Sequence, residues 1–366
     1  MRIVHTESSC AWGGQEIRVL SEMAGMAARG HELALFCPPE SRIYDEARSR
    51  GLIVSALPIA KKNVKALFAM RRELRRLQPD VVVTHSSTDS WLTALSIALD
   101  PVKVPLVRIR HISATVSRNV ASRWLYGRAA ARIVTTGERL RETLIRDLDL
   151  VPEQVTSIPT GIDLEYYSPG NRFAARRQLG LKEEAPLIGI VATLRSWKGH
   201  RYLLEAFAGM SNADAHLVIV GDGPGRENLR LQANELGITG RVTMPGNQNH
   251  VAPWLSALDV FVLPSYANEG VPQALMQAQA CGIAVISTAV GAIPEIVEDG
   301  VSGLLVPPRD ADALRNALNK VLDDADLRSR LADAGLAQAR RRYSDKIMID
   351  RMEAVLADAI VRPRAS

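Results

Sequence analysis

The residues best suited to chemistry in this chain lie in loops that follow predicted strands. Glu269 comes shortly after the apolar run 260–263, which is typical of a buried parallel strand. Pro272 suits the first position of a helix and Gly282 the position just past its end, so a short helix is predicted over 273–281. Helix N-termini at the strand-end edge of a parallel sheet bind anions, so this stretch predicts an anion site with one carboxylate in front of it.

Spacing alone leaves a second interpretation open. The same stretch fits an ordinary strand–helix–strand segment whose glycines and prolines only make turns. A following strand over 283–287 and a second helix from about Pro294 would repeat the pattern.

Other candidate residues also follow predicted strands. Gly13 and Gly14 lie in the loop after a strand over 2–6, where glycines let the backbone approach a ligand closely. His111 follows the strand that begins at Leu106. An isolated histidine is usually structural, but this position belongs to the loops that face ligands in such a sheet.

Strands and helices alternate through both halves of the chain, which predicts the α/β class with two doubly wound, Rossmann-like domains. The turn at Pro169-Gly170 marks the boundary, giving domains over 1–168 and 169–344. A cleft between two such domains is a natural ligand site. The pair Asp310 and Asp312 sits at a helix start, where acidic residues cap, so no metal site is predicted.

Composition limits the class of protein. The chain has 366 residues, 47% hydrophobic and 23% charged, as in globular proteins. Its three cysteines, Cys10, Cys37 and Cys281, are scattered and odd in number, which favours reduced thiols in a cytosolic setting. Residues 1–7 lack the apolar region of a signal peptide, and no apolar run is long enough to span a membrane.

Positive charge is concentrated in the first half. Residues 61–146 carry 17 Lys and Arg against 6 Asp and Glu, although the net charge of the whole chain is only +5. This excess predicts an anionic partner: a membrane surface, a phosphorylated acceptor or nucleic acid. Aromatic residues make up 5% of the chain and form no stacking platform, which disfavours nucleic acid.

The segment 61–77 is a basic amphipathic helix candidate. Val64, Leu67, Phe68, Leu74 and Leu77 recur at helical spacing among lysines and arginines. Such a helix binds a membrane surface or, alternatively, packs its apolar stripe on the sheet with a solvated basic face.

In order along nearly the whole chain, these residues resemble glycosyltransferase family 4, the retaining family with the GT-B fold. The motifs that carry the resemblance are Trp12-Gly13-Gly14, Pro159-Thr160-Gly161-Ile162-Asp163, Lys198-Gly199, Gly221-Asp222-Gly223-Pro224, Pro264-Ser265, Glu269-Gly270, Ala280-Cys281-Gly282, Gly291-Ala292-Ile293-Pro294-Glu295 and Asp299-Gly300-Val301-Ser302-Gly303. The resemblance implies two facing Rossmann-like domains, with a C-terminal helix of about 345–366 returning to the first.

The resemblance also implies a donor site in the second domain. Glu269 is expected near the hydroxyls of the transferred sugar, and Gly270, Val271 and Gln273 near the sugar and diphosphate. The family has a second carboxylate where this chain has Gln277, which accepts hydrogen bonds but carries no charge. This departure puts the affinity for the nucleotide, or the preference among nucleotides, in doubt.

The family's basic pair for the leaving diphosphate is only half matched. Lys198 occupies the lysine position, whereas Thr193 stands where relatives have arginine. Arg195 is expected to supply the missing charge, since fixed cations stabilise the charge that builds on the phosphate. An exposed loop arginine without such a role is the alternative.

The resemblance implies further residues for the donor site and for the acceptor site. Gly13 and Gly14 match the glycine loop near the diphosphate, and Gly221 belongs to the donor-binding set. His111 resembles the histidine that positions the transferred sugar. His85 and Ser86 are expected to shape the acceptor pocket.

The predicted function is therefore metal-independent, retaining transfer of a sugar from a nucleotide-diphosphate sugar to an anionic glycan or lipid-linked acceptor, such as a lipopolysaccharide core. No cofactor is expected, and the protein would be cytoplasmic, with peripheral contact to the inner membrane face. Two alternatives remain: a nucleotide-sugar 2-epimerase, which would need no acceptor, and a non-catalytic scaffold that binds sugar nucleotides.

Overall fold

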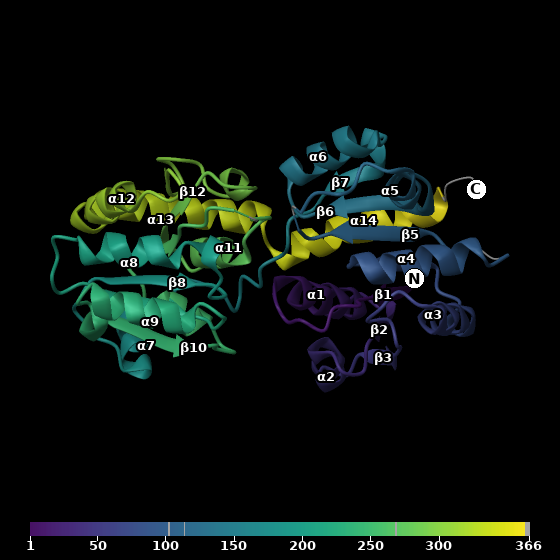
Figure 1. The fold of residues 1–366 in the computed structure, drawn as a ribbon, viewed down its shortest axis with the longest axis horizontal. Coiled ribbons are helices and arrows are strands. Elements are labelled where there is room, and N and C mark those ends of the chain that lie inside the picture. The colour runs from purple at the N-terminus through teal and green to yellow at the C-terminus, as the bar shows by residue number, and fades with distance from the viewer. Residues whose placement is uncertain (102, 113, 268, 363–366) are drawn as a thin grey trace. The chain divides into compact units, whose positions relative to one another are not determined.

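The structure is a computed structural model that describes residues 1–101, 103–112, 114–267 and 269–362. The chain folds into two compact units (Figure 1). Unit 1 comprises Met1–Gly161 and Asp345–Ser366, and unit 2 comprises Ile162–Ser344. The chain thus passes between the units twice.

The predicted domain limits need two adjustments. Residues 162–168 belong to unit 2, because Ile162 N donates to Tyr343 O at 2.7 Å and the Ile162 side chain packs in the core of unit 2. The C-terminal helix begins at Asp345 and ends at Val361. The predicted helical residues 363–366 lie outside the described residues.

Unit 1 is built on a parallel sheet. Its seven described strands are ordered β3-β2-β1-β4-β5-β6-β7. They are β1 Arg2–Thr6, β2 Glu32–Cys37, β3 Ile53–Ala56, β4 Val81–Thr84, β5 Leu106–Arg110, β6 Ala130–Thr135 and β7 Val155–Ser157. The order reverses between β1 and β4, and it is at such a point that open α/β sheets form ligand sites.

Helices cover both faces of this sheet. They are α1 Gly14–Ala28, α2 Arg42–Ser49, α3 Val64–Leu77, α4 Ser87–Ala98, α5 Val120–Trp124, α6 Glu138–Leu148 and α14 Asp345–Val361. Alternate strand residues face opposite sides. On β1, Ile3 packs in a core with α1, α2 and α14, whereas Val4 packs with α3 and α4. The yellow helix α14 therefore completes unit 1, although it follows unit 2 in sequence (Figure 1).

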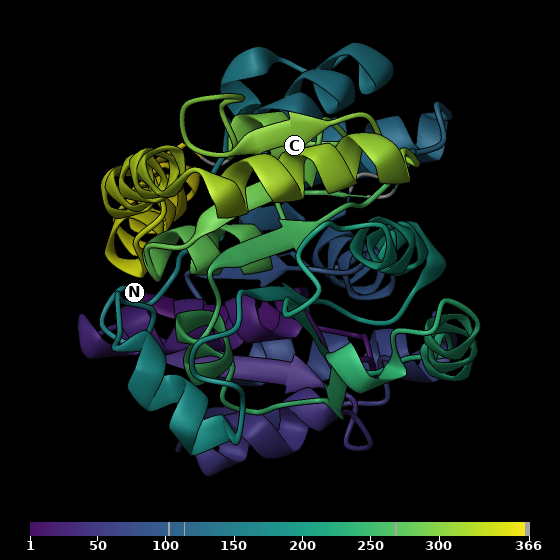
Figure 2. The ribbon, with the colours of Figure 1, turned by 90° about the vertical axis from the view of Figure 1, so that its left-hand side faces the viewer.

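Unit 2 has the same architecture around a single hydrophobic core. Its described strands run in parallel in the order β10-β9-β8-β11-β12-β13. Helices lie on both faces of this sheet (Figure 2). They are β8 Leu187–Val191, β9 His216–Val220, β10 Val242–Gly246, β11 Val260–Leu263, β12 Ala284–Thr288 and β13 Leu304–Val306. The helices are α7 Arg172–Leu179, α8 His200–Ala208, α9 Arg226–Glu235, α10 Ala252–Ser256, α11 Gln273–Ala280, α12 Ala311–Asp323 and α13 Ala325–Arg342. The predicted α/β class with two Rossmann-like domains is confirmed.

Two predicted helices differ from the structure. The helix predicted from about Pro294 is only a 3₁₀ turn over Ile293–Glu295. The chain then turns back, because Leu305 N donates to the Asp299 carboxylate at 2.8 Å and leads into β13. The basic helix α3 begins at Val64, since the Asn63 side chain caps it by accepting from Ala66 N.

The apolar residues predicted to form one stripe on α3 are partly buried and partly exposed in the structure. Leu74 is buried, whereas Val64 and Phe68 are 68% and 61% exposed. The face that packs on the sheet is instead completed by Ala66 and Met70. None of the helices in the described part of the chain is long and apolar enough to cross a membrane.

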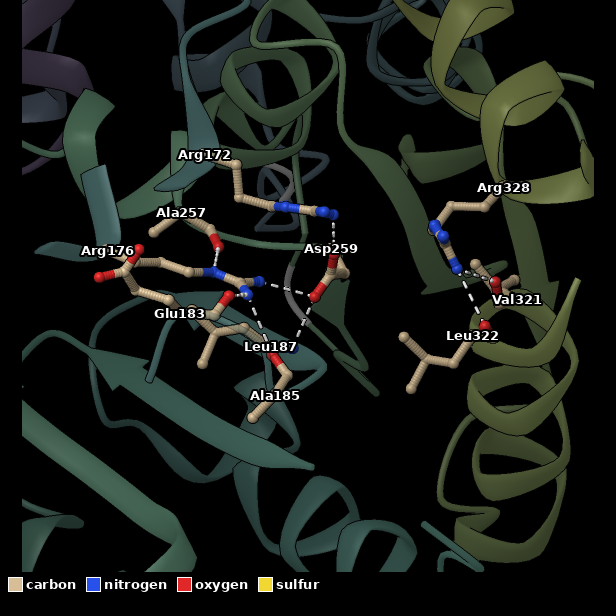
Figure 3. A network of polar contacts seen from close by, with 10 residues as sticks. All are labelled: Arg172, Arg176, Glu183, Ala185, Leu187, Ala257, Asp259, Val321, Leu322 and Arg328. Atoms are coloured by element: carbon tan, nitrogen blue, oxygen red, sulfur yellow. Dashed lines mark hydrogen bonds and ion pairs between the residues drawn. The ribbon is translucent and has the colours of Figure 1, made fainter. Parts of the chain in front are cut away.

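A buried ion-pair network holds α7 against the amino-terminal edge of the unit 2 sheet (Figure 3). The Arg176 side chain is 2% exposed, and its guanidinium donates to Asp259 at 2.7 Å and to the Ala257 carbonyl at 2.8 Å. Asp259 also accepts from Leu187 N at 2.7 Å and pairs with Arg172. One carboxylate therefore serves two helix arginines and the start of β8.

We predict that Asp259→Ala destabilises unit 2 by about 3–5 kcal/mol, because it leaves the buried Arg176 charge without its partner. Urea denaturation of the variant and the parent protein measures the difference. The matched control is Asp312→Ala, which breaks the exposed pair with Arg315 and should cost no more than about 1 kcal/mol. Equal losses in the two variants would contradict this account of the network.

Candidate active site

An ion pair lies at the carboxyl edge of the unit 2 sheet. Lys198 Nζ lies 2.7 Å from Glu269 Oε1, although their loops follow different strands, β8 and β11. Glu269 is 4% exposed, and it also accepts from Ser265 Oγ at 2.5 Å. The two residues predicted to act on the diphosphate and the sugar are thus already in contact. An ammonium has three N–H donors, so Lys198 keeps donors for a ligand.

Close backbone contacts fix the loops around this pair. Tyr266 N donates to Trp197 O at 2.8 Å, which joins the β8 and β11 loops. Gly291, in the loop after β12, has φ +60°, and a Cβ there would lie 2.0 Å from Glu269 O. Only glycine fits so close to the Glu269 backbone. The position of Glu269 therefore depends on both neighbouring loops.

Helix α11 begins beside Glu269. Pro272 occupies its N-cap and Gln273 its first position, so the short helix predicted here is confirmed. Gly270, Val271 and Gln273 are half-buried at this helix start, which leaves part of their surface open to solvent. Gln277 lies one turn further along and is also half-buried. A helix N-terminus in front of a carboxylate and an ammonium suits a sugar joined to a phosphate.

The structure does not join every predicted donor residue to this pair. The exposed Arg195 guanidinium lies over the Trp197 ring, 5.6 Å from its centroid, and lines a cavity of about 560 Å³ between α8 and α9. Within the described residues, no hydrogen bond or ion pair connects this guanidinium to Lys198 or Glu269; the link between Arg195 and Lys198 is through the backbone, where Lys198 N donates to Arg195 O at 3.0 Å. Gly221 has φ +136°, and a Cβ there would lie 2.0 Å from Ala192 O. Packing alone therefore explains a glycine at position 221.

The carboxyl edge of the unit 1 sheet holds three histidines. His85, which follows β4, lies 3.0 Å from His5 of β1 and 3.0 Å from His111 after β5, measured between ring nitrogens. His5 is 0% and His85 3% exposed, whereas His111 is partly exposed. His85 is thus enclosed by His5 and His111, so its predicted role in shaping the acceptor pocket, which stays a prediction, would be exerted through His111.

Ser86 is also committed to contacts within unit 1. Its hydroxyl donates to Glu7 Oε1 at 2.5 Å and accepts from Gln15 Nε2 at 3.0 Å. Its backbone N–H donates to Asp89. Donation from this hydroxyl to an acceptor would require breaking the bond to Glu7, and the predicted acceptor-binding role of Ser86 stays a prediction.

The buried carboxyl groups Glu7 and Asp89 organise this edge. Asp89 accepts from Thr6 Oγ1 at 2.8 Å and from the N–H groups of His85 and Ser86. Burial raises the pKa of Glu7, and the nearby Asp89 charge raises it further. Burial also raises the pKa of Asp89. Two acids so close together in an apolar interior favour keeping one proton between them.

The glycine loop lies beside these acids. Gly13 is the N-cap of α1 and Gly14 its first residue. The backbone at Gly13 is extended, with φ −173°, and the nearest neighbour to a Cβ there would be 3.8 Å away. Neither backbone conformation nor packing requires glycine at position 13, which fits the predicted approach of a ligand.

Sequence reasoning assigned no role to His5, Glu7, Asp89 or Ser265, although Ser265 belongs to a motif that carried the family resemblance. Each lies at the end of a strand, directly after one, or, for Asp89, in the first turn of the next helix. That position is the signal that could have found them, because it is the one that identified His111. Their burial could not be read from the sequence.

Two family models match the chain. Residues 12–166 match the model described as Glycosyltransferase Family 4, and residues 171–338 match the one described as Glycosyl transferases group 1. A D-inositol 3-phosphate glycosyltransferase of Stackebrandtia nassauensis is 30% identical over 400 residues, covering 97% of this chain and 88% of the relative.

Solved structures share the fold. HepE of Anabaena in complex with UDP superposes with a TM-score of 0.85 at 20% identity, covering 98% of this chain and 100% of HepE. A glycosyltransferase of Rickettsia africae superposes with a TM-score of 0.89 at 16% identity, covering 99% of each chain.

The two parallel-sheet units and these matches define the class of protein as a glycosyltransferase with the GT-B fold. The chain belongs to the family in which a Glycosyltransferase Family 4 domain precedes a Glycosyl transferases group 1 domain. The predicted enzyme class is thereby confirmed.

We predict that Glu7→Gln reduces the loss of folding stability that occurs as the pH rises from about 5 to about 8. The raised pKa of Glu7 means that the folded protein keeps a proton that the unfolded chain releases above its ordinary value of 4.5. The folded state therefore loses stability as the pH rises from that value through the raised pKa. The variant has no such group, so its stability should fall less between about pH 5 and about pH 8. Urea denaturation across this range measures the slopes.

The control for this prediction is Glu142→Gln, which changes an exposed glutamate on α6 of the same unit. Its slope should match that of the parent protein. A Glu7→Gln slope equal to that of the parent would show that Glu7 is ionised in the folded state at neutral pH.

Proposed function

We propose that this glycosyltransferase moves a sugar from a nucleotide-diphosphate sugar to an anionic acceptor, with retention of anomeric configuration and without a metal ion. The observation that carries the proposal is the Lys198–Glu269 pair at the start of α11. It combines a fixed cation for a diphosphate with a carboxylate for sugar hydroxyls, which is the set of groups that a sugar diphosphate requires.

The reaction needs charge on the leaving group to be stabilised. The bond from the anomeric carbon to the diphosphate oxygen breaks, and the acceptor hydroxyl forms a new bond on the same face. The acceptor proton passes to the leaving phosphate. Negative charge that builds on the phosphate oxygens is met by Lys198 and the α11 N-terminus, and Arg195 adds a second cation once its side chain turns toward the ligand.

The donor is proposed to carry UDP or a similar nucleotide. HepE, which shares this fold, was solved in complex with UDP. Gln277 would accept from the ribose hydroxyls through its amide oxygen. A neutral amide makes a weaker acceptor than a carboxylate, so nucleotide binding is expected to be weaker than in a chain with Glu at position 277.

The acceptor is proposed to be anionic and to bind unit 1. The name of the Stackebrandtia relative specifies a phosphorylated polyol, and a lipid-linked glycan or a lipopolysaccharide core would present the same phosphate chemistry. Many basic residues of 61–146 already have partners: Arg71 and Arg75 pair with Asp100, and Arg118 and Arg146 with Asp147.

In the described part of the chain, one group of positive charges without ion-pair partners lies in and just before α3. Within the described residues, Lys61, Lys62, Lys65 and Arg72 are exposed and form no ion pair. The exposed Val64 and Phe68 lie on the same helix. This combination supports peripheral contact with an anionic membrane surface, from which a lipid-linked acceptor would be reached.

We predict that Lys198→Ala and Glu269→Ala each lower kcat by about 10²–10³-fold, the usual cost of removing one transition-state contact. Turnover is followed as UDP release from UDP-sugars with a phosphorylated polyol or lipid-linked acceptor, in the presence of EDTA. The control is Arg201→Ala, which removes the exposed α8 pair with Glu205 and the contact of the guanidinium with the Tyr202 ring and should leave kcat unchanged.

Three outcomes would contradict this proposal. Full turnover in both variants would show that Lys198 and Glu269 are not the catalytic pair. Loss of turnover in EDTA would show that the reaction requires a metal ion. Conversion of a nucleotide sugar to its epimer without any acceptor would indicate a 2-epimerase instead.

We predict that Phe68→Ser weakens binding to vesicles of anionic phospholipid by at least about tenfold, since a buried aromatic side chain contributes about 1.5–3 kcal/mol. The triple change Lys61→Gln, Lys62→Gln and Lys65→Gln should weaken binding on the order of a hundredfold, at about 1 kcal/mol for each charge. Vesicle co-sedimentation measures both.

The matched control is Leu231→Ser on α9 of unit 2, where Leu231 is 47% exposed. It should not alter vesicle binding. Equal binding to uncharged phosphatidylcholine vesicles, or no effect of the lysine changes, would exclude the proposed membrane contact.

A further inference from the structure

Three imidazole rings form a continuous hydrogen-bonded column at the carboxyl edge of unit 1. His5 Nδ1 lies 3.0 Å from His85 Nε2, and His85 Nδ1 lies 3.0 Å from His111 Nε2. The ring centroids are 5.3 and 5.2 Å apart and the ring planes differ by 14° and 29°, so neighbouring rings are nearly parallel and meet edge to edge through their nitrogens. His85 uses Nε2 toward His5 and Nδ1 toward His111, so the two hydrogen bonds can point the same way along the column, in either direction.

The column has one buried end and one accessible end. His5 Nε2 is buried and has no hydrogen-bond partner within the described residues. His111 is the partly exposed member, and its Nδ1 forms no hydrogen bond with another described residue. A ligand at this edge would therefore meet His111 Nδ1, and the other rings lie behind it.

All three rings are neutral at physiological pH. Burial lowers the pKa of His5 to about 3 and lowers the pKa of His85 and His111 well below the ordinary value. Arg18 of α1 and Arg108 of β5 lower the pKa of His85 and His111 further, and Arg110 also acts on His111. The column therefore carries one proton on each ring.

Counting these protons leaves only two arrangements. Each nitrogen–nitrogen contact of 3.0 Å holds one proton, since two lone pairs or two N–H groups would repel. If His5 donates from Nδ1, His85 must donate from Nδ1, and His111 then also carries its proton on Nδ1. If the direction reverses, all three rings carry their proton on Nε2. A mixed column would break one of the two hydrogen bonds.

We propose that His5 and His85 are positioning residues that fix the ring of His111 and couple its tautomer to their own, so that the three rings always share one tautomer. His111 Nδ1 is a hydrogen-bond donor in one arrangement and an acceptor in the other. The same neutral side chain can thus meet a phosphate oxygen or a sugar hydroxyl, and the choice is made along the whole column.

Through this coupling, His5, which touches no ligand, affects the tautomer of His111. When a ligand group that accepts a hydrogen bond approaches His111 Nδ1, both internal protons must lie on the Nδ1 side of their bonds. In the other arrangement, which suits a ligand group that donates to His111 Nδ1, each ring carries its one proton on Nε2. The column stays neutral throughout, so no buried charge is created. The catalytic consequence, though not the tautomer coupling itself, rests on the proposed sugar transfer.

The direct test is nitrogen NMR of the full chain labelled with ¹⁵N-histidine, which distinguishes the two tautomers by the shifts of Nδ1 and Nε2. The chain has only 7 histidines, so the rings can be assigned with single variants. His5, His85 and His111 are expected to share one tautomer, with and without UDP. A different tautomer on any one of the three would overturn the proposal, whatever the enzyme transfers.

Variants at His5 test the positioning role. An asparagine amide occupies nearly the place of Nδ1 and can donate or accept, so His5→Asn should keep His85 and His111 in one tautomer and keep kcat within about twofold. His5→Leu removes the end of the column and should lower kcat by up to about tenfold, the rate equivalent of one hydrogen bond. UDP binding, measured by thermal shift, should stay the same in both.

The matched control is Val83→Ala, a buried change on β4 next to His5 in the sheet register. It should destabilise unit 1 without altering the tautomers or kcat. If His5→Leu folds and keeps both the parent kcat and the parent tautomers, His5 is not a positioning residue. If His5→Leu does not fold, kcat and the tautomers of His5→Asn decide, and a change in either overturns the coupling.

Discussion

The parallel pairing of β1, β4 and β5 is the constraint on which the chemistry of unit 1 depends. In the register of this sheet, Thr6 lies beside Thr84, and Thr84 beside Arg108. Neighbouring strands are about 4.8 Å apart, so side chains at successive strand ends are separated by little more than one ring. Three histidines at such positions can touch only in sequence along the sheet edge, and the backbone geometry thereby determines their hydrogen bonds.

The same constraint has a different result in unit 2. There the loops after β8, β11 and β12 contact one another through the backbone, and a glycine is required where Gly291 passes Glu269. Moving a lysine and a glutamate out of water is costly. The Ser265 hydroxyl and the contact with Lys198 offset that cost for a carboxylate that is 4% exposed. The ion pair is therefore maintained by the loops around it.

The sequence was informative wherever local patterns decide structure. The apolar run Val260–Leu263, the proline and glycine that flank α11, and the aspartate that caps α12 all had clear signals, and Asp310 does accept from Ala313 N. Motif order along the chain identified the GT-B fold. Position after a strand was enough to select His111 and Glu269.

The sequence was uninformative where tertiary packing decides. The spacing of apolar residues on α3 could not show that Val64 and Phe68 point to solvent while Met70 is buried. His85 had the same signal as His111, yet its neighbours His5 and His111 enclose it. The helix expected from Pro294 gave way to a turn because Asp299 bonds to the backbone of β13, a contact with no signal in local propensity.

The return of α14 to unit 1 has a consequence for the order in which this protein can be made. Met348, Ile349, Met352 and Leu356 fill a core that also contains residues of β1 and α1. During synthesis that apolar surface stays uncovered until all of unit 2 has emerged from the ribosome, so unit 2 can reach its final state first. The first domain to be translated is thus the last to be completed, and its exposed core is a natural substrate for chaperones.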